Sequence, residues 1–126
     1  MDFLEDRIGA DGRRVNAVRR WIDAQEKPGR VAIDAQLRYL EETETWTYKE
    51  IKKRKGTEHI YELIIKANKI QYRPLCFYGP GPRQLTILLG ATEKDWRLEK
   101  NADQKAERHR EIVLKDRSRI RDHEYR

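Results

Sequence analysis

The stretch from His59 to Lys94 constrains the fold of this chain most, because it gathers β-branched, leucine and aromatic residues into short runs. Two turn signals, the polar residues 66–69 and the Gly/Pro segment 79–83, divide the stretch into three short apolar runs. Short apolar runs joined by Gly, Pro and Asn turns are typical of antiparallel strands that follow one another in a meander. We therefore expect a small, mostly antiparallel, twisted sheet here, with helices before and after it.

The segment before the sheet is expected to form a helical hairpin. Apolar residues recur at helical spacing in residues 13–25 and again from Arg30 onward, and the segment Glu26–Gly29 is expected to separate the two helices. The positions that follow this spacing are Val15, Val18 and Ile22 in the first helix, and Ile33, Leu37 and Leu40 in the second. Neither helix can bury its apolar stripe alone, so the pair should pack on the sheet.

The two ends of the chain carry weaker signals. Residues 1–12 are acidic and Gly-containing, which indicates a loose arm or an edge strand. After the sheet, Asn101 or Asp103 can cap a helix whose apolar line is Ala102, Ala106 and Val113. Beyond Leu114 the chain is so polar that we expect a solvated helix extension or disorder. The sequence thus predicts one α+β domain, with a core at about residues 14–115 and a charged tail at 116–126.

Composition indicates which kinds of partner and which cellular location to expect. Charged residues make up 40% of the 126 residues, with a net charge of +6 and a pI near 9.5, which favours an acidic partner such as nucleic acid or an acidic protein. The single cysteine, Cys76, lies inside an apolar run and is interpreted as a small buried hydrophobe. No apolar run approaches the roughly 20 residues of a membrane span, and the first residues are acidic, so a cytosolic protein without a membrane partner is expected.

Several kinds of enzyme chemistry are disfavoured by the residues present. The three histidines are scattered and there is one cysteine, so zinc-ligand spacing is absent from the sequence. The segment 79–83 has prolines where a phosphate-binding loop needs free N–H groups. Ser118 is the only serine and lies in the charged tail, which argues against a serine hydrolase. We expect a protein that needs no cofactor and no metal.

Basic and aromatic side chains around the expected sheet indicate a different chemistry. They are Lys52, Lys53, Arg54, Lys66, Tyr72, Arg73, Arg83, Lys94, Trp96 and Arg97. Cations can stabilise the charge that develops at a phosphodiester during cleavage, while a general base takes the proton of the 2′-hydroxyl. A lysine whose pKa is depressed by neighbouring cations can be that base. Apart from Arg73, each of the basic residues is on its own compatible with a charge at a strand edge that faces water.

Arg73 and the segment 46–55 leave alternatives open. Arg73 precedes the expected central strand, where an arginine either binds an anion or pairs with a buried carboxylate such as Glu62 or Glu93. The basic segment 46–55 is compatible with a solvated loop, or with charges that converge on whatever the sheet binds. Its aromatic residues, Trp46 and Tyr48, could stack on a base or pack against a helix.

The order of these motifs resembles the RelE/ParE toxin superfamily, in particular its phage-derived, HigB-like branch. The resemblance covers roughly residues 14–115. It rests on the helical hairpin and on Ile60–Leu63, Tyr72–Arg73 with Phe77, Leu88–Lys94, and Asn101–Ala102 with Ala106. The chain departs from RelE on the first sheet strand, where Glu62 and Ile64 stand in place of lysines, and the family's final tyrosine has no match within residues 99–104.

The resemblance implies the toxin of a type II toxin-antitoxin system, which cuts mRNA on the ribosome. Its expected partners are a cognate antitoxin, often of the helix-turn-helix type, together with the ribosome and mRNA. Arg73 matches the arginine that holds the scissile phosphate, Lys94 matches a lysine after the last strand, and Lys66 or Lys94 is the candidate base. The residues expected to hold RNA are Lys52, Lys53, Arg54, Arg83, Trp96 and Arg97.

Two other functions remain open at this point. One is a non-catalytic binding module of the same fold, either a ParE-like gyrase inhibitor or a phage accessory protein. The other is a DNA-binding protein that uses the C-terminal helix, although that helix has no periodic face for reading bases.

Overall fold

The computed structural model describes residues 2–4, 17–43, 45–81, 84–93 and 98–122. It has three α-helices, one short 3-10 helix and eight strands in these ranges. In chain order they are β1 (Asp2–Leu4), α1 (Ala17–Asp23), α2 (Lys27–Glu42), β2 (Ile51–Lys53), β3 (Tyr61–Leu63), β4 (Ile65–Ala67), β5 (Ile70–Tyr72), β6 (Leu75–Tyr78), β7 (Leu85–Leu89), α3 (Ala102–Lys115), η1 (Arg117–Arg119) and β8 (Ile120–Asp122). This composition confirms the α+β class.

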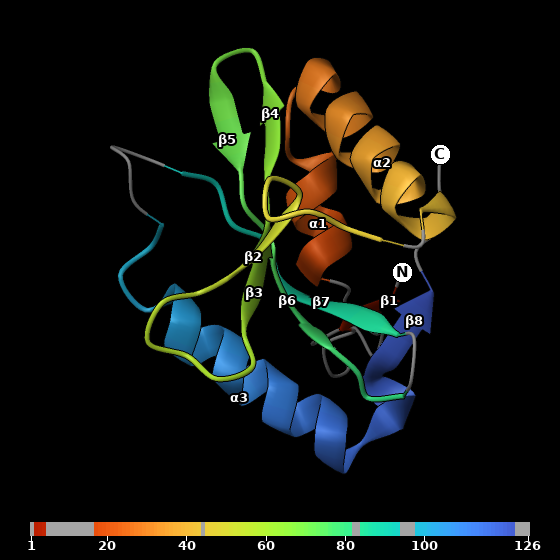
Figure 1. The fold of residues 1–126 in the computed structure, drawn as a ribbon, viewed down its shortest axis with the longest axis vertical. Helices are drawn as coiled ribbons and strands as arrows, with labels where there is room; N and C mark the ends of the chain where they lie inside the picture. The colour runs from red at the N-terminus through yellow and green to blue at the C-terminus, as the bar shows by residue number, and fades with distance from the viewer. Residues whose placement is uncertain (1, 5–16, 44, 82–83, 94–97, 123–126) are drawn as a thin grey trace, which may run out of the picture.

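Six strands form one sheet in the order β2-β3-β6-β7-β1-β8, and every neighbouring pair is antiparallel except β1 and β7 (Figure 1). The meander expected from the sequence is present as β3, β6 and β7. Its first hairpin extends beyond the main sheet as β4 and β5, which pair with each other. The turn between them places Asn68 and Lys69 at positive φ (49° and 64°), as a two-residue hairpin turn with right-handed strand twist requires.

The helical hairpin is present, but its connection is shorter than expected. The segment Glu26–Gly29 was expected to separate the helices, whereas α2 already begins at Lys27. The reason is Pro28, which fits the first turn of a helix because its missing N–H has no partner there in any case. Gly29 therefore lies inside the helix, where Tyr72 approaches so closely that a Cβ would be 2.3 Å from the tyrosine hydroxyl.

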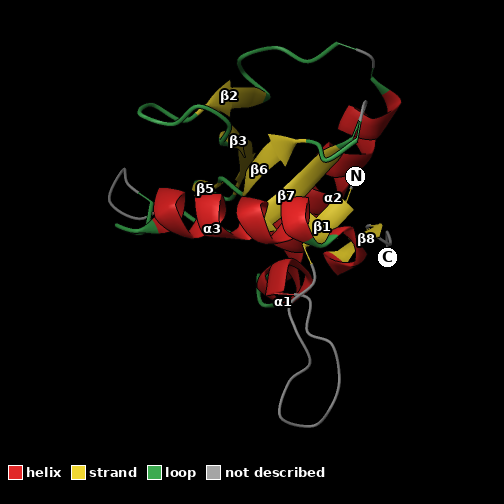
Figure 2. Cartoon of the chain, turned by 90° about the horizontal axis from the view of Figure 1, so that it is seen from below, coloured by secondary structure: helices red, strands yellow, loops and turns green. Residues whose placement is uncertain are grey.

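The central part of the sheet is buried on both faces. On one face α1 and α2 pack against an apolar cluster whose fully buried members include Val18, Ile22, Ile33, Leu37 and Leu40 from the helices and Leu63, Cys76 and Ile87 from the strands. On the other face α3 covers a second cluster formed by Ile60, Leu75, Phe77, Leu88, Ala102, Ala106 and Val113. Figure 2 shows α3 running across β6 and β7. The apolar line predicted for α3 is thus confirmed.

The ends of the chain differ from expectation. β1, expected as a loose arm or an edge strand, lies inside the sheet between β7 and β8. The tail after Leu114, expected to be a solvated helix extension or disordered, instead forms η1 and β8. Backbone pairing with β1 supplies the order that the polar sequence does not indicate. Within the described residues, none of the helices has both the length and the apolar character that crossing a membrane requires.

Candidate functional site

Arg73 lies between β5 and β6, where the long hairpin passes from the two-stranded sheet into the main sheet. Its backbone N–H donates to the carbonyl of Ala91 (2.8 Å), which ties this junction to the end of β7. Its guanidinium donates two hydrogen bonds to Glu62, from Nε to Oε2 (3.0 Å) and from Nη2 to Oε1 (2.9 Å). This two-point contact fixes the plane of the guanidinium. Of the two alternatives for Arg73, the structure shows pairing with a carboxylate.

Glu62 also binds a second arginine. Arg54 donates from Nη1 to Glu62 Oε2 (3.0 Å) and from Nε to Asp103 Oδ1 at the start of α3 (2.9 Å). Burial lowers the pKa of Arg54, but the hydrogen bonds and charges of Asp103 and Glu62 outweigh it, so the pKa is raised overall. With its side chain only 5% exposed, Glu62 on β3 is the centre of a chain of charges that runs through Arg54, just after β2, to Asp103 in α3.

Besides Glu62, a second carboxylate lies near Arg73, on the Nη1 side of its guanidinium. Glu93 Oε2 lies 3.7 Å from Arg73 Nη1, and this oxygen is buried without a hydrogen-bond partner in the described part of the chain. Glu93 is held by its own backbone, whose N–H donates to the carbonyl of Gln71 (2.9 Å). We call Arg54, Glu62, Arg73, Glu93 and Asp103 the ion network. Both carboxylates that the sequence offered as partners of Arg73 belong to it.

The lysines expected to bind RNA lie elsewhere on the sheet. Lys52 and Lys53 are exposed on β2, an edge strand that replaces the expected loop. Lys52 is opposite Glu62 and Lys53 is opposite Tyr61, so the two lysines project from opposite faces of the sheet. Arg54, expected to join them, turns instead into the ion network. The candidate base Lys66 is exposed on β4, in the outer hairpin. Lys94, Arg83, Trp96 and Arg97 lie outside the described residues.

An aromatic cluster forms a feature that the sequence indicated only in part. Trp46 stacks on Tyr78, with ring centroids 6.0 Å apart and planes at 24°, and Tyr78 meets Tyr61 edge to face at 4.9 Å. Trp46 was singled out in the sequence as a candidate for stacking or packing. Tyr61 and Tyr78 were missed, although strand alternation and pairing could have placed them on one face.

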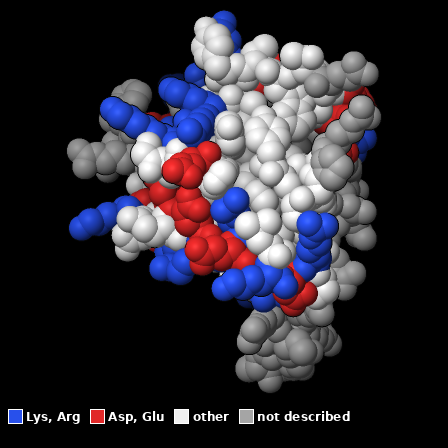
Figure 3. Space-filling view, turned by 60° about the horizontal axis from the view of Figure 1, so that its bottom comes forward, with Lys and Arg blue, Asp and Glu red and all other residues white. Residues whose placement is uncertain are grey.

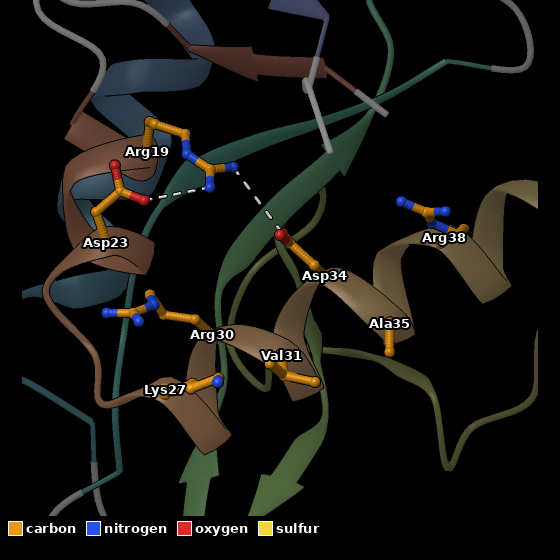
Figure 4. A pocket seen from close by; sticks show the side chains of 8 residues that line it. All are labelled: Arg19, Asp23, Lys27, Arg30, Val31, Asp34, Ala35 and Arg38. Carbon is orange, nitrogen blue, oxygen red and sulfur yellow. Dashed lines mark hydrogen bonds and ion pairs between the residues drawn. The ribbon is translucent and has the colours of Figure 1, made fainter. Parts of the chain in front are cut away.

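A groove of about 720 Å³ lies between α1 and α2 on the helical surface of the molecule (Figure 4). Four of its lining residues are basic and two are acidic: Arg19, Lys27, Arg30, Arg38, Asp23 and Asp34. Arg19 forms ion pairs with Asp23 (3.2 Å) and Asp34 (3.9 Å), so part of this charge is neutralised within the groove. The groove lies on the helical surface, whereas the ion network lies at the sheet and α3.

The charge on the side of α3 is mixed. Figure 3 shows a band of acidic side chains bordered by basic ones, next to a broad area with few charged side chains. Within the described ranges, no group of His, Cys, Asp and Glu has an arrangement that could hold a metal ion. Cys76 is buried, and burial raises the pKa of its thiol, with a further contribution from the charge of Glu62. A neutral, buried thiol is a poor nucleophile.

The fold and the ion network define a basic α+β protein whose sheet carries a fixed arginine at the start of a central strand. Residues 20–111 match the model of a family described as phage derived protein Gp49-like (DUF891). Because the match covers most of the chain, this protein belongs to that family, which is a RelE/HigB-like toxin family. A search of the curated proteins gives no match. A search of the solved structures gives none either.

Proposed function

We propose that this protein is the toxin of a type II toxin-antitoxin system and cleaves ribosome-bound mRNA without a metal. Family membership supports the toxin class. The observation that carries the catalytic part is the orientation of Arg73. Glu62 holds its Nε and Nη2 edge, while within the described ranges its Nη1 has only the longer ion pair with Glu93 at 3.7 Å. An arginine held rigidly by one edge is preorganised to bind a phosphate with the other.

The proposed reaction uses Arg73 together with a general base. A base, for which Lys94 and Lys66 are the candidates, takes the proton of the 2′-hydroxyl, and the 2′-oxygen attacks the adjacent phosphorus. The bond from phosphorus to the 5′-oxygen breaks, and that oxygen takes up a proton as it leaves. Arg73 stabilises the negative charge on the phosphate oxygens during this step. Lys52 projects from the same face of the sheet as Glu62, which supports a role for this lysine in holding the RNA backbone.

The expected partners follow from the same proposal. A cognate antitoxin, as a small protein with an acidic segment, would neutralise the exposed lysines of β2 and keep the toxin inactive. Binding to the native state alone stabilises a protein by about 2.7 kcal/mol when the ligand is at a hundredfold excess over its dissociation constant. We propose that the toxin acts in the cytosol, where the ribosome and mRNA are found.

A second candidate function is a non-catalytic binding module of the same fold, for example a gyrase inhibitor. The observation that favours it is the complete pairing of Glu62, which binds Arg54 and Arg73 at once. In this case Arg73 serves to balance a buried carboxylate, and a partner would bind the outer surface. The two functions make opposite predictions for the same substitution.

The test is Arg73→Ala and Arg73→Lys, each examined by a thermal melt, by growth after induction and by primer extension on cellular mRNA. The nuclease proposal expects both variants to lose toxicity and to lose cleavage by about 10²- to 10³-fold. Arg73→Lys keeps a positive charge beside Glu62 and should stay folded, so it decides the test if Arg73→Ala unfolds through loss of this ion pair. Arg20→Ala, which removes an exposed arginine of α1, is the matched control and should remain toxic. A folded Arg73→Ala variant that still arrests growth and cuts mRNA would overturn the nuclease. Growth arrest without cleavage by the unchanged protein would favour the binding module.

A further inference from the structure

The aromatic cluster of Trp46, Tyr61 and Tyr78 extends the apolar face under α1 and α2 to the surface. Trp46 and Tyr61 are partly buried against that face, whereas Tyr78 is 52% exposed. Tyr78 contacts both other rings, one by stacking and one edge to face. The Tyr78 ring is therefore half exposed and held in position by two neighbouring rings, so a planar ligand can stack beside it.

Hydrogen bonds fix the cluster in place. The indole N–H of Trp46 donates to the carbonyls of Leu40 (2.9 Å) and Thr43 (3.0 Å) at the end of α2. The Leu40 carbonyl also accepts the backbone N–H of Thr43 (3.2 Å), so the indole adds a second donor at the C-terminal end of the helix. The orientation of the Trp46 ring is thereby set before any ligand arrives. A ligand that stacks here would lose little free energy in ordering the rings.

A cation lies on the same face of the sheet. Lys53 is directly opposite Tyr61 in the ladder between β2 and β3, and residues opposite one another project from the same face. Lys53 is exposed, and among the described residues its ammonium forms no ion pair with a carboxylate. The nearest acidic residue along the chain, Glu50, is engaged by Tyr39 and by the backbone N–H of Thr47. The lysine is therefore available to an anionic group of a ligand on the cluster.

We propose that Trp46, Tyr61, Tyr78 and Lys53 form a stacking platform for single-stranded RNA. Bases stack on exposed aromatic rings regardless of sequence, and a nearby lysine holds the phosphate. A duplex hides the faces of its bases, so the platform should select single strands. The choice of RNA over DNA rests on the proposed function. The platform is a contact separate from Arg73, because Lys53 and Lys52 project from opposite faces of the edge strand β2.

The position of β2 explains how one strand of RNA could use both surfaces. β2 is the outermost strand of the main sheet, with Lys52 on the face of the ion network and Lys53 on the face of the aromatic cluster. An RNA strand that crosses this edge meets one lysine on each side. The platform would then hold nucleotides next to those that reach Arg73, and it would raise affinity without touching the scissile phosphate.

The experiment uses the full chain and follows tryptophan fluorescence during titration with an eight-nucleotide oligouridylate, with a twelve-base-pair RNA duplex as a second probe. We expect the single strand to quench fluorescence and the duplex to do so much less. The variant Trp46→Phe should lose most of the quenching. Tyr78→Ala should weaken binding by about 5- to 150-fold, the range that one stacked base contributes. Tyr78→Phe keeps the ring and should bind like the unchanged protein.

Matched controls separate the platform from general effects. Tyr48→Ala removes a tyrosine that is 75% exposed and lies outside the cluster, and it should leave the affinity unchanged. Lys53→Gln should weaken binding, whereas Lys100→Gln, at an exposed site before α3, should not. A thermal melt of each variant shows whether the fold is kept. Should Tyr78→Ala be unfolded, the comparison of Trp46→Phe with the unchanged protein still tests the site.

Three results would overturn the proposal. The first is an equal loss of RNA affinity in Tyr78→Ala and Tyr48→Ala, and the second is equal affinity for the duplex and the single strand. The third is a Tyr78→Ala variant that keeps its RNA affinity but loses a co-purifying protein partner. The last result would make the cluster a protein-docking surface. Failure of the toxin proposal is distinguishable, because binding by the platform with no growth arrest or mRNA cleavage would leave the platform standing and the nuclease refuted.

Discussion

The face of the sheet that α1 and α2 cover is closed by apolar side chains, whereas the face that α3 covers also contains the ion network. On the first face Ile33, Leu37 and Leu40 are fully buried and need only matching shapes around them. On the second, Glu62 is almost as deeply buried but requires two arginines to balance its charge. The two faces therefore tolerate change differently. An apolar side chain can be exchanged for another of similar volume, while a charge cannot lose its partners without a large cost.

The largest effect is expected from Glu62→Ala, which tests whether the ion network is the sensitive face. The substitution leaves Arg54 and Arg73 side by side without the carboxylate they share. Breaking a buried ion pair by removing one partner costs about 3 to 5 kcal/mol of stability. Urea unfolding would measure this loss, with Glu58→Ala as the control because its carboxylate is 90% exposed. A loss below about 1 kcal/mol, the range of surface pairs, would mean that water already screens the network.

Leu37→Ala provides the counterpart on the apolar face. Leu37 is fully buried between α2 and the sheet, so its truncation leaves a cavity. Such truncations cost about 2 to 5 kcal/mol, depending on how far the surroundings relax. The expected difference from Glu62→Ala lies in the salt dependence. Adding salt should leave the cost of Leu37→Ala unchanged, while it should reduce the cost of Glu62→Ala by screening the two arginines. Equal salt responses in urea unfolding would remove the distinction between the faces.

The two faces also differ in how far the sequence predicts them. Apolar periodicity placed Ile33, Leu37 and Leu40 on one side of a helix, because burial of that stripe is the main reason the helix folds. The line of Ala102, Ala106 and Val113 in α3 was found for the same reason. The helix boundary at Lys27 was missed because a proline there has opposite meanings, breaking a helix in its interior and starting one at its first turn.

The ion network was only partly predictable. Glu62 and Glu93 could be named as partners of Arg73, since a charge beside a central strand needs balance. The roles of Arg54 and Asp103 could not be foreseen, because 49 residues separate them and only the packing of α3 brings them together. β1 and β8 illustrate the same limit. Three-residue strands from the two ends of the chain pair with each other and carry too few residues for a periodic signal.

Cys76 links the two faces and gives a prediction about alkaline pH. Its thiol lies on the apolar face, where burial raises its pKa, and the negative charge of Glu62 adds to the effect. A group whose pKa is raised in the folded state contributes stability that is complete below the unfolded pKa, near 9.0, and is lost as the pH rises above it. Above that pH the free energy of unfolding should fall by at most about 1.4 kcal/mol per pH unit from this thiol.

The measurement for Cys76 is urea unfolding at a series of pH values from 7 to about 10.5, with Cys76→Ala beside the unchanged protein. The variant loses some stability at every pH through the smaller side chain, so the slopes are compared and not the absolute values. The unchanged protein should show the steeper decline above the unfolded pKa of the thiol. Parallel curves would show that the thiol ionises as readily in the folded state as in the unfolded one, contrary to its burial.

The smallest effect is expected from Asp103→Asn, at the rim of the ion network. Asp103 accepts a hydrogen bond from Arg54 Nε at 2.9 Å, and its side chain is 31% exposed, far more than that of Glu62. Asparagine keeps one oxygen to accept this bond, and Arg54 keeps its contact with Glu62, so the charge at the rim and the longer bond from Arg54 Nη2 to Asp103 Oδ2 (3.4 Å) are lost. Partly exposed ion pairs contribute about 0.2 to 1 kcal/mol, and we expect a loss of stability within that range.

Urea unfolding of Asp103→Asn, Glu62→Ala and the double variant would measure how far the two sites are coupled. A coupling near zero would mean that Arg54 serves each carboxylate independently, whereas a coupling above about 0.5 kcal/mol shows that rim and centre act as one network. If Asp103→Asn lost as much stability as Glu62→Ala, the cost of a substitution in the ion network would not depend on how deeply the residue is buried. The contrast between the two faces would then fail.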